Sequence, residues 1–359
     1  MRNKKKIGIL TFHKALNFGA VWQCYALQHT CEALGHEVET IDYNPFGHHT
    51  IKWAICHRPL VAYSYLMFMR QLGRFVSQRL NLTEHTESHE WIKQNPPQKD
   101  VYIVGSDMVW SRTIVDSYLN SYLLDFAPSN VKRISYAAST GGNPLELNED
   151  ELAELRKFSA ISVREKQVVP NIQEKVNVPV VDVCDPTLLL TQDDYAQLEQ
   201  RPWWLPKHYI VHSDIARDSF CADVAKMISR QLNIPVLNLA GIYKSWAKRN
   251  YLAPTPEQWL YIFHHADFVC TNSFHSVAFS IIYNRPFICC AAKIGGRAKA
   301  NGRVLNLLEQ TGFSHRYVSE LSQITDDLIK DTTDIGRSVA KVEKYRSRSL
   351  QWLKNAIEQ

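Results

Sequence analysis

The chain has 359 residues, of which 45% are hydrophobic and 21% charged, a composition typical of a folded α/β protein rather than a disordered one. This length exceeds that of a usual single hydrophobic core, so we expect two domains. The formal net charge is +5 at pH 7, and residues 43–83 contain five Lys or Arg residues but no acid. The excess charge is therefore local, and without an RNA or DNA motif it does not indicate a nucleic-acid partner.

The cysteines and the N-terminal residues bear on the compartment. None of the eight cysteines forms a CxxC pair, and most lie in apolar runs, so we expect reduced core thiols rather than disulfides or a zinc site. The apolar run at residues 7–12 is too short for a signal peptide, and no run reaches the roughly 20 residues that span a bilayer. We therefore expect a cytoplasmic protein.

The fourteen histidines include two adjacent pairs, His48-His49 and His264-His265. Neighbouring side chains diverge on a continuous helix or strand, so we predict no metal site from either pair.

The first elements predict a parallel sheet. Residues 6–12 are typical of a strand, residues 17–20 of a loop that opens a helix, and residues 21–34 of that helix. A second strand at residues 37–43 completes a βαβ unit. The loop has one glycine, Gly19, where a dinucleotide-binding fingerprint has three, so a dinucleotide site is weakly supported.

A basic helical segment follows. Residues 61–80 place apolar and aromatic side chains at helical spacing, with Arg70 and Arg74 on the other side. Such a helix either covers the domain as a solvated face or lies on an anionic membrane surface. Simple packing is favoured, because Gly73 weakens the helix.

Polar clusters end each of the next predicted strands. Ligands of open α/β sheets bind at the carboxyl ends of strands, so these clusters are candidate site residues. The predicted strands, each with the cluster that follows it, are 100–104 with Ser106 and Asp107, 133–138 with Ser139 and Thr140, 160–163 with Arg164 and Glu165, and 178–183 with Asp185 and Pro186.

The second half repeats this alternation of strands and helices. Residues 200–207 contain two prolines and two tryptophans and cannot continue a helix, so we place the domain linker there. We predict an N-terminal Rossmann-like domain at 1–200 with a basic helical insertion at about 51–83, a C-terminal Rossmann-like domain at 208–335, and a helix at 336–359 that crosses back to the first domain. The fold class is α/β, with two facing Rossmann-like domains and an interdomain cleft, an arrangement that suits transferase chemistry.

One stretch, residues 266–280, reads as a strand, a tight polar turn and a helix. Ser273 is a good N-cap, which places His275 in the first helical turn. Unpaired backbone amides and the positive end of the helix dipole favour an anion there, and a histidine adds a charged donor or a proton. The alternative is that His275 only caps or packs.

Six stretches of the chain, spread over about residues 6–310, form a pattern that is specific for one protein family. Each alone is weak, but together and in order they resemble the polysaccharide pyruvyl transferase family. The stretches are Lys6-Ile-Gly-Ile-Leu-Thr-Phe-His with Asn17-Phe-Gly-Ala and Tyr25-Ala-Leu-Gln; Val104-Gly-Ser-Asp-Met-Val-Trp; Ile134-Ser-Tyr-Ala-Ala-Ser; Ile161-Ser-Val-Arg-Glu; Asp185-Pro-Thr-Leu-Leu-Leu; and Thr271-Asn-Ser-Phe-His-Ser.

The resemblance implies a GT-B-like fold and transfer of a pyruvyl group from phosphoenolpyruvate to two hydroxyls of a sugar, giving a cyclic ketal on a surface glycan. It implies no cofactor besides this donor substrate. The donor-binding positions fall on Arg164 and on Ser273, Phe274 and His275. Some relatives have an arginine where this chain has Ser273, so we expect Arg303 or Arg297 to supply that contact.

The chemistry assigns further roles. Phosphoenolpyruvate is a dense anion that needs guanidinium groups and helix-end amides. Ketal formation needs a general acid, for which His275 is the best candidate, because its ordinary pKa lies near working pH and a bound phosphate would raise it. Asp107, with Asp185 behind it, is the candidate base. The alternatives are a turn-forming role for Asp107 and Asp185 and a structural salt bridge for Arg164.

The acceptor side is assigned to Asn17, Ser106, Asp107 and Trp110. The structural alternatives are that Asn17 shapes the first loop and that Trp110 fills the core. By resemblance the acceptor is a sugar carried on a lipid at the inner membrane face, which would give the basic segment a peripheral membrane contact.

Two rival functions remain open. A nucleotide-sugar glycosyltransferase would use the same fold, but no convincing acidic pair for a ribose lies near Gly241. A non-catalytic glycan-binding protein would have lost the histidine or arginine at the strand ends, and both are present.

Overall fold

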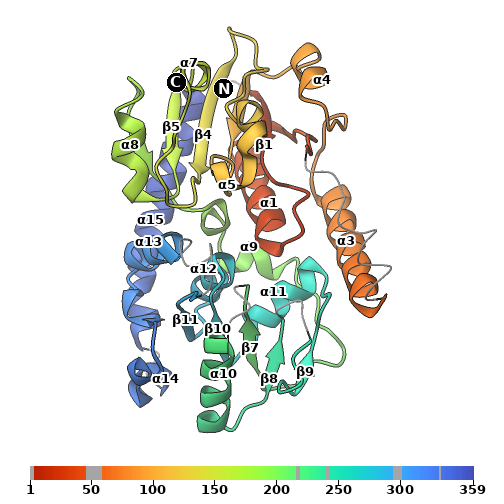
Figure 1. Cartoon of the computed structure of the whole chain (residues 1–359), viewed down its shortest axis with the longest axis vertical. Helices are drawn as coiled ribbons and strands as arrows, with labels where there is room; N and C mark the ends of the chain where they lie inside the picture. The colour runs from red at the N-terminus through yellow and green to blue at the C-terminus, as the bar shows by residue number, and fades with distance from the viewer. Residues whose placement is uncertain (1–3, 46–58, 216–218, 240–242, 294–300, 331–332) are drawn as a thin grey trace. The chain divides into compact units, whose positions relative to one another are not determined.

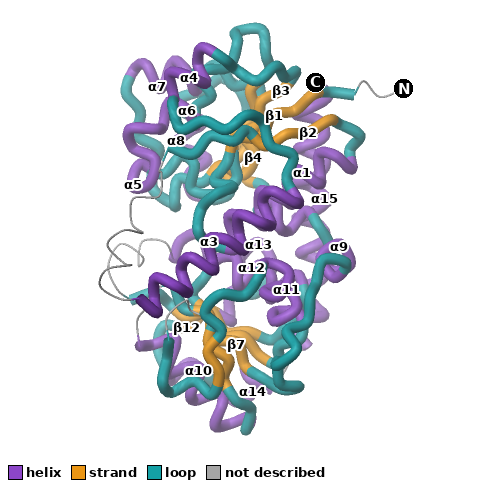
Figure 2. Tube along the Cα trace, turned by 90° about the vertical axis from the view of Figure 1, so that its right-hand side faces the viewer, coloured by secondary structure: helices purple, strands orange, loops and turns teal. Residues whose placement is uncertain are grey.

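The computed structural model describes residues 4–45, 59–215, 219–239, 243–293, 301–330 and 333–359 (Figure 1). The described chain divides into two compact units. In each unit helices and loops surround a central sheet (Figure 2). His48-His49, Gly241 and Arg297, which the sequence singled out, lie outside the described residues.

Unit 1 is built on a six-stranded parallel sheet in the order β2-β1-β3-β4-β5-β6. Its strands are β1 (Lys6–Leu10), β2 (Glu37–Thr40), β3 (Val101–Val104), β4 (Lys132–Ala138), β5 (Ala160–Val163) and β6 (Val180–Asp182). Its helices include α1 (Phe18–Ala33), α4 (His89–Gln94), α5 (Arg112–Val115), α6 (Leu119–Tyr122), α7 (Glu149–Leu155) and α8 (Val169–Gln173).

Unit 2 holds a second six-stranded parallel sheet in the order β12-β11-β10-β7-β8-β9. Its strands are β7 (Ile210–Ser213), β8 (Val236–Asn238), β9 (Arg249–Asn250), β10 (Phe268–Thr271), β11 (Phe287–Cys290) and β12 (Tyr317–Val318). Its helices include α9 (Gln192–Ala196), α10 (Ser219–Leu232), α11 (Pro256–His264), α12 (Phe274–Ile282), α13 (Asn301–Thr311) and α14 (Asp326–Lys330). Two parallel sheets confirm the predicted α/β class.

Local sequence signals explain these elements. Strands β3 and β10 are buried at every residue, as expected for parallel strands covered on both faces. Helix α1 begins where the side chain of Asn17 accepts a hydrogen bond from the Ala20 amide, and Gly35, with φ of 96°, follows its end. The chain passes from unit 1 to unit 2 after Leu189, before the stretch at which the sequence predicts a linker.

Two helices are shared between the units. In α3 (Pro59–Arg79) the residues up to Leu72 group with unit 2, and in α15 (Thr333–Glu358) the residues from Arg346 onward group with unit 1. The Ser349 hydroxyl of α15 accepts a hydrogen bond from the Cys184 amide at 2.9 Å, just beyond β6. The end of the C-terminal helix therefore packs on the unit 1 sheet.

The state of the cysteines and the character of the helices bear on two of the predictions. The seven cysteines among the described residues are buried and form no disulfide, as predicted. Among the same residues, no helix combines the length and the apolar character needed to cross a membrane.

A buried carboxylate, Asp42, joins three segments at the carboxyl ends of β1 and β2. Its oxygens lie 3.0 Å from His13 Nε2, 2.6 Å from Lys14 Nζ and 3.0 Å from His85 Nδ1. Burial raises the pKa of Asp42, but the hydrogen bonds from His13, Lys14 and His85 outweigh it and hold the pKa well below its ordinary value.

We predict that Asp42→Asn lowers the free energy of unfolding by about 2 kcal/mol at pH 7, because the buried His13 and the partly exposed Lys14 and His85 lose their charged acceptor. Since the folded-state pKa of Asp42 is depressed, its contribution is complete above the ordinary aspartate pKa of about 3.9 and is lost as pH falls below it. Urea unfolding between pH 7 and pH 3 should show the difference between the two proteins starting to narrow below about pH 4, while most of it persists at pH 3, because the pKa of folded Asp42 lies lower still. Asp223→Asn, in a half-exposed pair with Lys226, is the control and should change little.

Candidate active site

In unit 1 the carboxyl ends of β3, β5 and β6 meet around Arg164, which is 2% exposed. Its Nη1 donates to Asp185 Oδ2 at 3.0 Å, its Nε lies 3.6 Å from Glu165 Oε1, and its Nη2 lies 4.0 Å from Asp107 Oδ1. Burial lowers the pKa of Arg164, but the carboxylates of Glu165, Asp185 and Asp107 outweigh it, and the pKa is raised. The salt-bridge alternative for Arg164 is therefore present, and a donor-binding role stays a prediction.

Asp185 is held on both carboxylate oxygens. Oδ2 accepts hydrogen bonds from Arg164 and from the Ser106 hydroxyl at 3.1 Å, while Oδ1 accepts from the amide and hydroxyl of Thr187 at 3.0 and 2.8 Å. Both carboxylate oxygens of Asp185 are thus engaged, so the structural alternative is present, and a role behind Asp107 stays a prediction.

The loop after β3 aims Asp107 at this cluster. Gly105 has φ of 106°, and a side chain there would collide with the Tyr136 carbonyl oxygen, so the position requires glycine. Asp107 itself adopts a positive φ of 68°, and its Oδ1 accepts the Met108 amide at 2.9 Å. The turn-forming alternative for Asp107 is therefore present, and a base role remains a prediction.

The other residues assigned to the acceptor have structural contacts. Trp110 is 1% exposed, its Nε1 donates to the Tyr122 carbonyl at 3.0 Å, and its ring packs edge-on against Phe158. The core-filling alternative for Trp110 is therefore present, and an acceptor-binding role stays a prediction. Ser106 is fully buried and donates to Asp185, and Asn17 caps α1.

In unit 2 the predicted strand, turn and helix are present as β10, residues 272–273 and α12. Ser273 is the N-cap, as predicted, and its side chain accepts from the Ser276 amide. The Thr271 hydroxyl accepts from the Ser273 amide at 2.9 Å and donates to the Ser213 carbonyl at 2.7 Å, which ties the turn to β7. The start of α12 is therefore fixed at the carboxyl edge of the sheet.

Asn272 and Asp214 extend this cluster, although no role for either residue was predicted from the sequence. The Asn272 side chain donates to Asp214 Oδ1 at 2.7 Å and accepts from the Ile215 amide at 2.8 Å. Strands β7 and β10 are adjacent and parallel, with Ser213 opposite Thr271. The sequence places polar residues at the ends of both of these strands. It does not give the strand order that brings Asn272 and Asp214 together.

His275 stands in the first turn of α12 and is half-buried, with its ring edge-on to Phe274 at 5.1 Å. Phe274 is 5% exposed. Arg303 lies in the first turn of α13, a helix that packs against α12. Arg164 belongs to unit 1 and His275 and Arg303 to unit 2, so the convergence of these residues on one donor stays a prediction.

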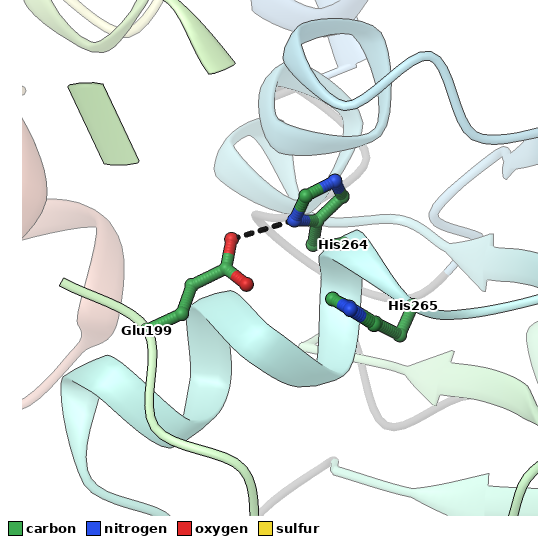
Figure 3. Close-up of side chains that lie close together, drawn as sticks. All are labelled: Glu199, His264 and His265. Carbon is green, nitrogen blue, oxygen red and sulfur yellow. Dashed lines mark hydrogen bonds and ion pairs between the residues drawn. The ribbon is translucent and has the colours of Figure 1, made fainter. Parts of the chain in front are cut away.

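A different cluster lies at the amino-terminal end of β10. Glu199, His264 and His265 each place a potential ligand atom within 4.8 Å of the others (Figure 3). The prediction that the His264 and His265 side chains diverge is wrong, since their ring centroids are 4.6 Å apart. Helix α11 ends at His264, and His265 is its C-cap with φ of −107° and ψ of 9°, so the spacing of a continuous helix does not apply.

The protonation of His265 also reflects this setting. Burial lowers the pKa of His265, and the neighbouring His264 lowers it further, as do Arg285 and Arg201, against the opposing effect of Glu199.

The family model for polysaccharide pyruvyl transferase matches residues 17–293. The chain belongs to the polysaccharide pyruvyl transferase family. The match includes both Arg164 and the Ser273 to His275 turn. A separate comparison of the chain with individual curated protein sequences found no match.

Solved structures show the fold of this family member. UGT89C1 of Arabidopsis thaliana, solved with UDP-L-rhamnose, overlays with a TM-score of 0.54 at 10% identity, covering 98% of this chain and 99% of that chain. The spinosyn forosaminyltransferase SpnP gives 0.48 at 10% identity over 96% and 95% of the two chains, and the Streptomyces sp. SF2575 glycosyltransferase SsfS6 gives 0.44 at 12% over 95% and 96%. The UGT89C1 overlay supports the GT-B class with two Rossmann-like domains.

We predict that Arg164→Met destabilises this pyruvyl transferase family member by about 3–5 kcal/mol, because removing the cation leaves buried carboxylates uncompensated. Arg348→Met is the matched control. It removes an arginine that pairs with Asp182 at 2.8 Å but is 52% exposed, so its loss should stay below about 1 kcal/mol. Urea unfolding at pH 7 measures both. Equal, small losses would show that the Arg164 cluster contributes no more than a surface pair.

Proposed function

We propose that this protein transfers a pyruvyl group from phosphoenolpyruvate to two hydroxyls of a sugar in a surface polysaccharide or its lipid-linked precursor, releasing phosphate. The family match over residues 17–293 carries the proposal. The N-terminus of α12, capped by Ser273 and bearing His275, adds a physical reason: backbone amides and a histidine suit a phosphorylated acid.

The proposed reaction begins with His275 as general acid. Its proton goes to the CH2 carbon of phosphoenolpyruvate, which becomes a methyl group and leaves an oxocarbenium-like centre at C2. A first sugar hydroxyl attacks C2 and gives its proton to a base. Phosphate then leaves C2, and the second hydroxyl closes the ketal with loss of its proton. No net oxidation or reduction takes place.

Asp107 is the proposed base, and Arg303 the proposed contact for the donor phosphate. Asp107 is 8% exposed at the end of β3, where the loop fixes its backbone. A carboxylate suits transient proton acceptance, and a guanidinium suits bidentate binding of phosphate. Arg164 is proposed to act on the same donor while held by Asp185.

A glycosyltransferase acting in surface polysaccharide biosynthesis is the alternative function. It is favoured by the overlay with UGT89C1, a structure solved with UDP-L-rhamnose. The two functions differ in the donor they consume, so assays of one protein preparation with each donor distinguish them.

We predict that His275→Asn reduces ketal formation at least 100-fold, since loss of a general acid costs about 10²–10⁴ in rate. The assay supplies phosphoenolpyruvate with a panel of p-nitrophenyl and lipid-linked sugars and follows phosphate release and the mass gain of the ketal. His208→Asn, an exposed histidine of the same unit that pairs with Asp267, is the control and should keep full activity. Turnover of sugar nucleotides in place of phosphoenolpyruvate would replace this proposal with the glycosyltransferase one.

We further propose that the acceptor is lipid-linked and that α3 contacts the inner membrane face. Arg70, Arg74 and Arg79 are exposed on this helix, and Tyr63 and Leu66 are exposed hydrophobic residues on it. Cations beside exposed aromatic and aliphatic side chains are typical of helices that lie on anionic membranes.

We predict that the Arg70→Glu/Arg74→Glu double variant loses activity on a lipid-linked acceptor in anionic vesicles but not on a soluble sugar analogue, because each cation near such a surface is worth about 1 kcal/mol. Equal losses on both acceptors would argue against membrane contact.

A further inference from the structure

We propose that Glu199, His264 and His265 form a zinc site at the amino-terminal edge of the unit 2 sheet. The three residues belong to one unit, and their potential ligand atoms lie within 4.8 Å of one another (Figure 3). His264 Nδ1 is already 2.7 Å from Glu199 Oε1. The proposal is independent of the proposed pyruvyl transfer.

Aromatic stacking restricts both imidazoles before any metal binds. The His264 ring stacks on Tyr283 with centroids 4.4 Å apart and planes 8° from parallel. The His265 ring stacks on Tyr261 at 3.9 Å and 14°. The Glu199 side chain is 7% exposed. Because Glu199 and His264 have little freedom left to lose, binding a metal through them costs less conformational entropy.

The helix end adds a favourable field. His264 is the last residue of α11, and His265 is its C-cap. The carbonyl groups at the carboxyl end of a helix carry the negative end of its dipole, which favours a cation. The positive charges of Arg201 and Arg285 also act on His265, so the electrostatic potential at the site is not strongly negative.

This donor set selects the metal. Two imidazoles and one carboxylate are a common zinc set with a fourth position for water, whereas Mg²⁺ and Ca²⁺ prefer oxygen ligands. Ligand atoms at about 2.1 Å from a tetrahedral zinc lie roughly 3.4 Å apart. A separation of 4.8 Å, the upper limit within this cluster, must therefore close by roughly 1.4 Å, whereas the 2.7 Å between His264 Nδ1 and Glu199 Oε1 must widen by roughly 0.7 Å. Rotation of the exposed His265 side chain away from its stack on Tyr261 provides the closure.

The zinc has a structural role. It would join the segment after α9, which carries Glu199, to the junction of α11 and β10. The Gln200 amide already donates to the carbonyl of Glu257, in the first turn of α11, at 3.2 Å. The Ser273 to His275 turn lies at the opposite, carboxyl end of β10, so the metal takes no part in chemistry there.

The test uses full-length protein without a polyhistidine tag, treated with a chelator and then titrated with ZnCl₂. We expect one Zn²⁺ per chain by calorimetry, a melting temperature that rises with Zn²⁺ but not with Mg²⁺, and the visible absorption of tetrahedral Co²⁺ on cobalt substitution. His265→Ala and Glu199→Gln should weaken Zn²⁺ binding at least tenfold. Because His265 is exposed, its variant should fold normally.

His208→Ala is the matched control. His208 Nδ1 pairs with Asp267 at 3.1 Å in the same unit, but this pair belongs to no three-ligand group in the described chain. This variant should bind Zn²⁺ like the wild type. The proposal is overturned if Zn²⁺ binds no more tightly to the wild type than to His265→Ala, or if His208→Ala loses as much. Either result would leave Glu199 and His264 as an ordinary ion pair.

Discussion

Compensation of the buried charge of Arg164 is the constraint on which the carboxyl edge of unit 1 depends. A guanidinium that is 2% exposed cannot rely on water, so it needs fixed carboxylates around it. Asp185, Glu165 and Asp107 come from three strand ends, and Ser106 and Thr187 then orient Asp185. One cation thereby holds loops together that are remote in the sequence.

Unit 2 fixes its corresponding edge by another means. Thr271 and Asn272 bind backbone groups and Asp214 through short side chains, which leaves the start of α12 defined by its cap at Ser273. A helix start fixed by neighbouring side chains offers amides in a set direction, and this preorganisation is what binding of a small anion requires. The two edges are thus fixed by different means: ion pairs around Arg164 in unit 1, and short polar side chains with a helix cap in unit 2.

Features set by local sequence could be predicted, and features set by strand order could not. The strand, turn and helix around Ser273, and the cap at Asn17, follow from short-range patterns. The burial of Trp110 depends on which segments cover it, and its position after a strand gave no sign of this. Glu199 was missed for the same reason, because its partner His264 is 65 residues away.

The alternation of strands and helices explains why the unit 2 sheet has chemically different edges. Each helix that follows a parallel strand starts at the carboxyl edge and returns to the amino edge, so positive helix ends gather at one edge and negative ends at the other. His275 near the start of α12 and His264 at the end of α11 are the same residue type in opposite fields. The first setting favours an anion beside the imidazole, and the second favours a cation bound to it. The end of the helix at which each histidine lies, rather than its residue type, therefore decides which chemistry it supports.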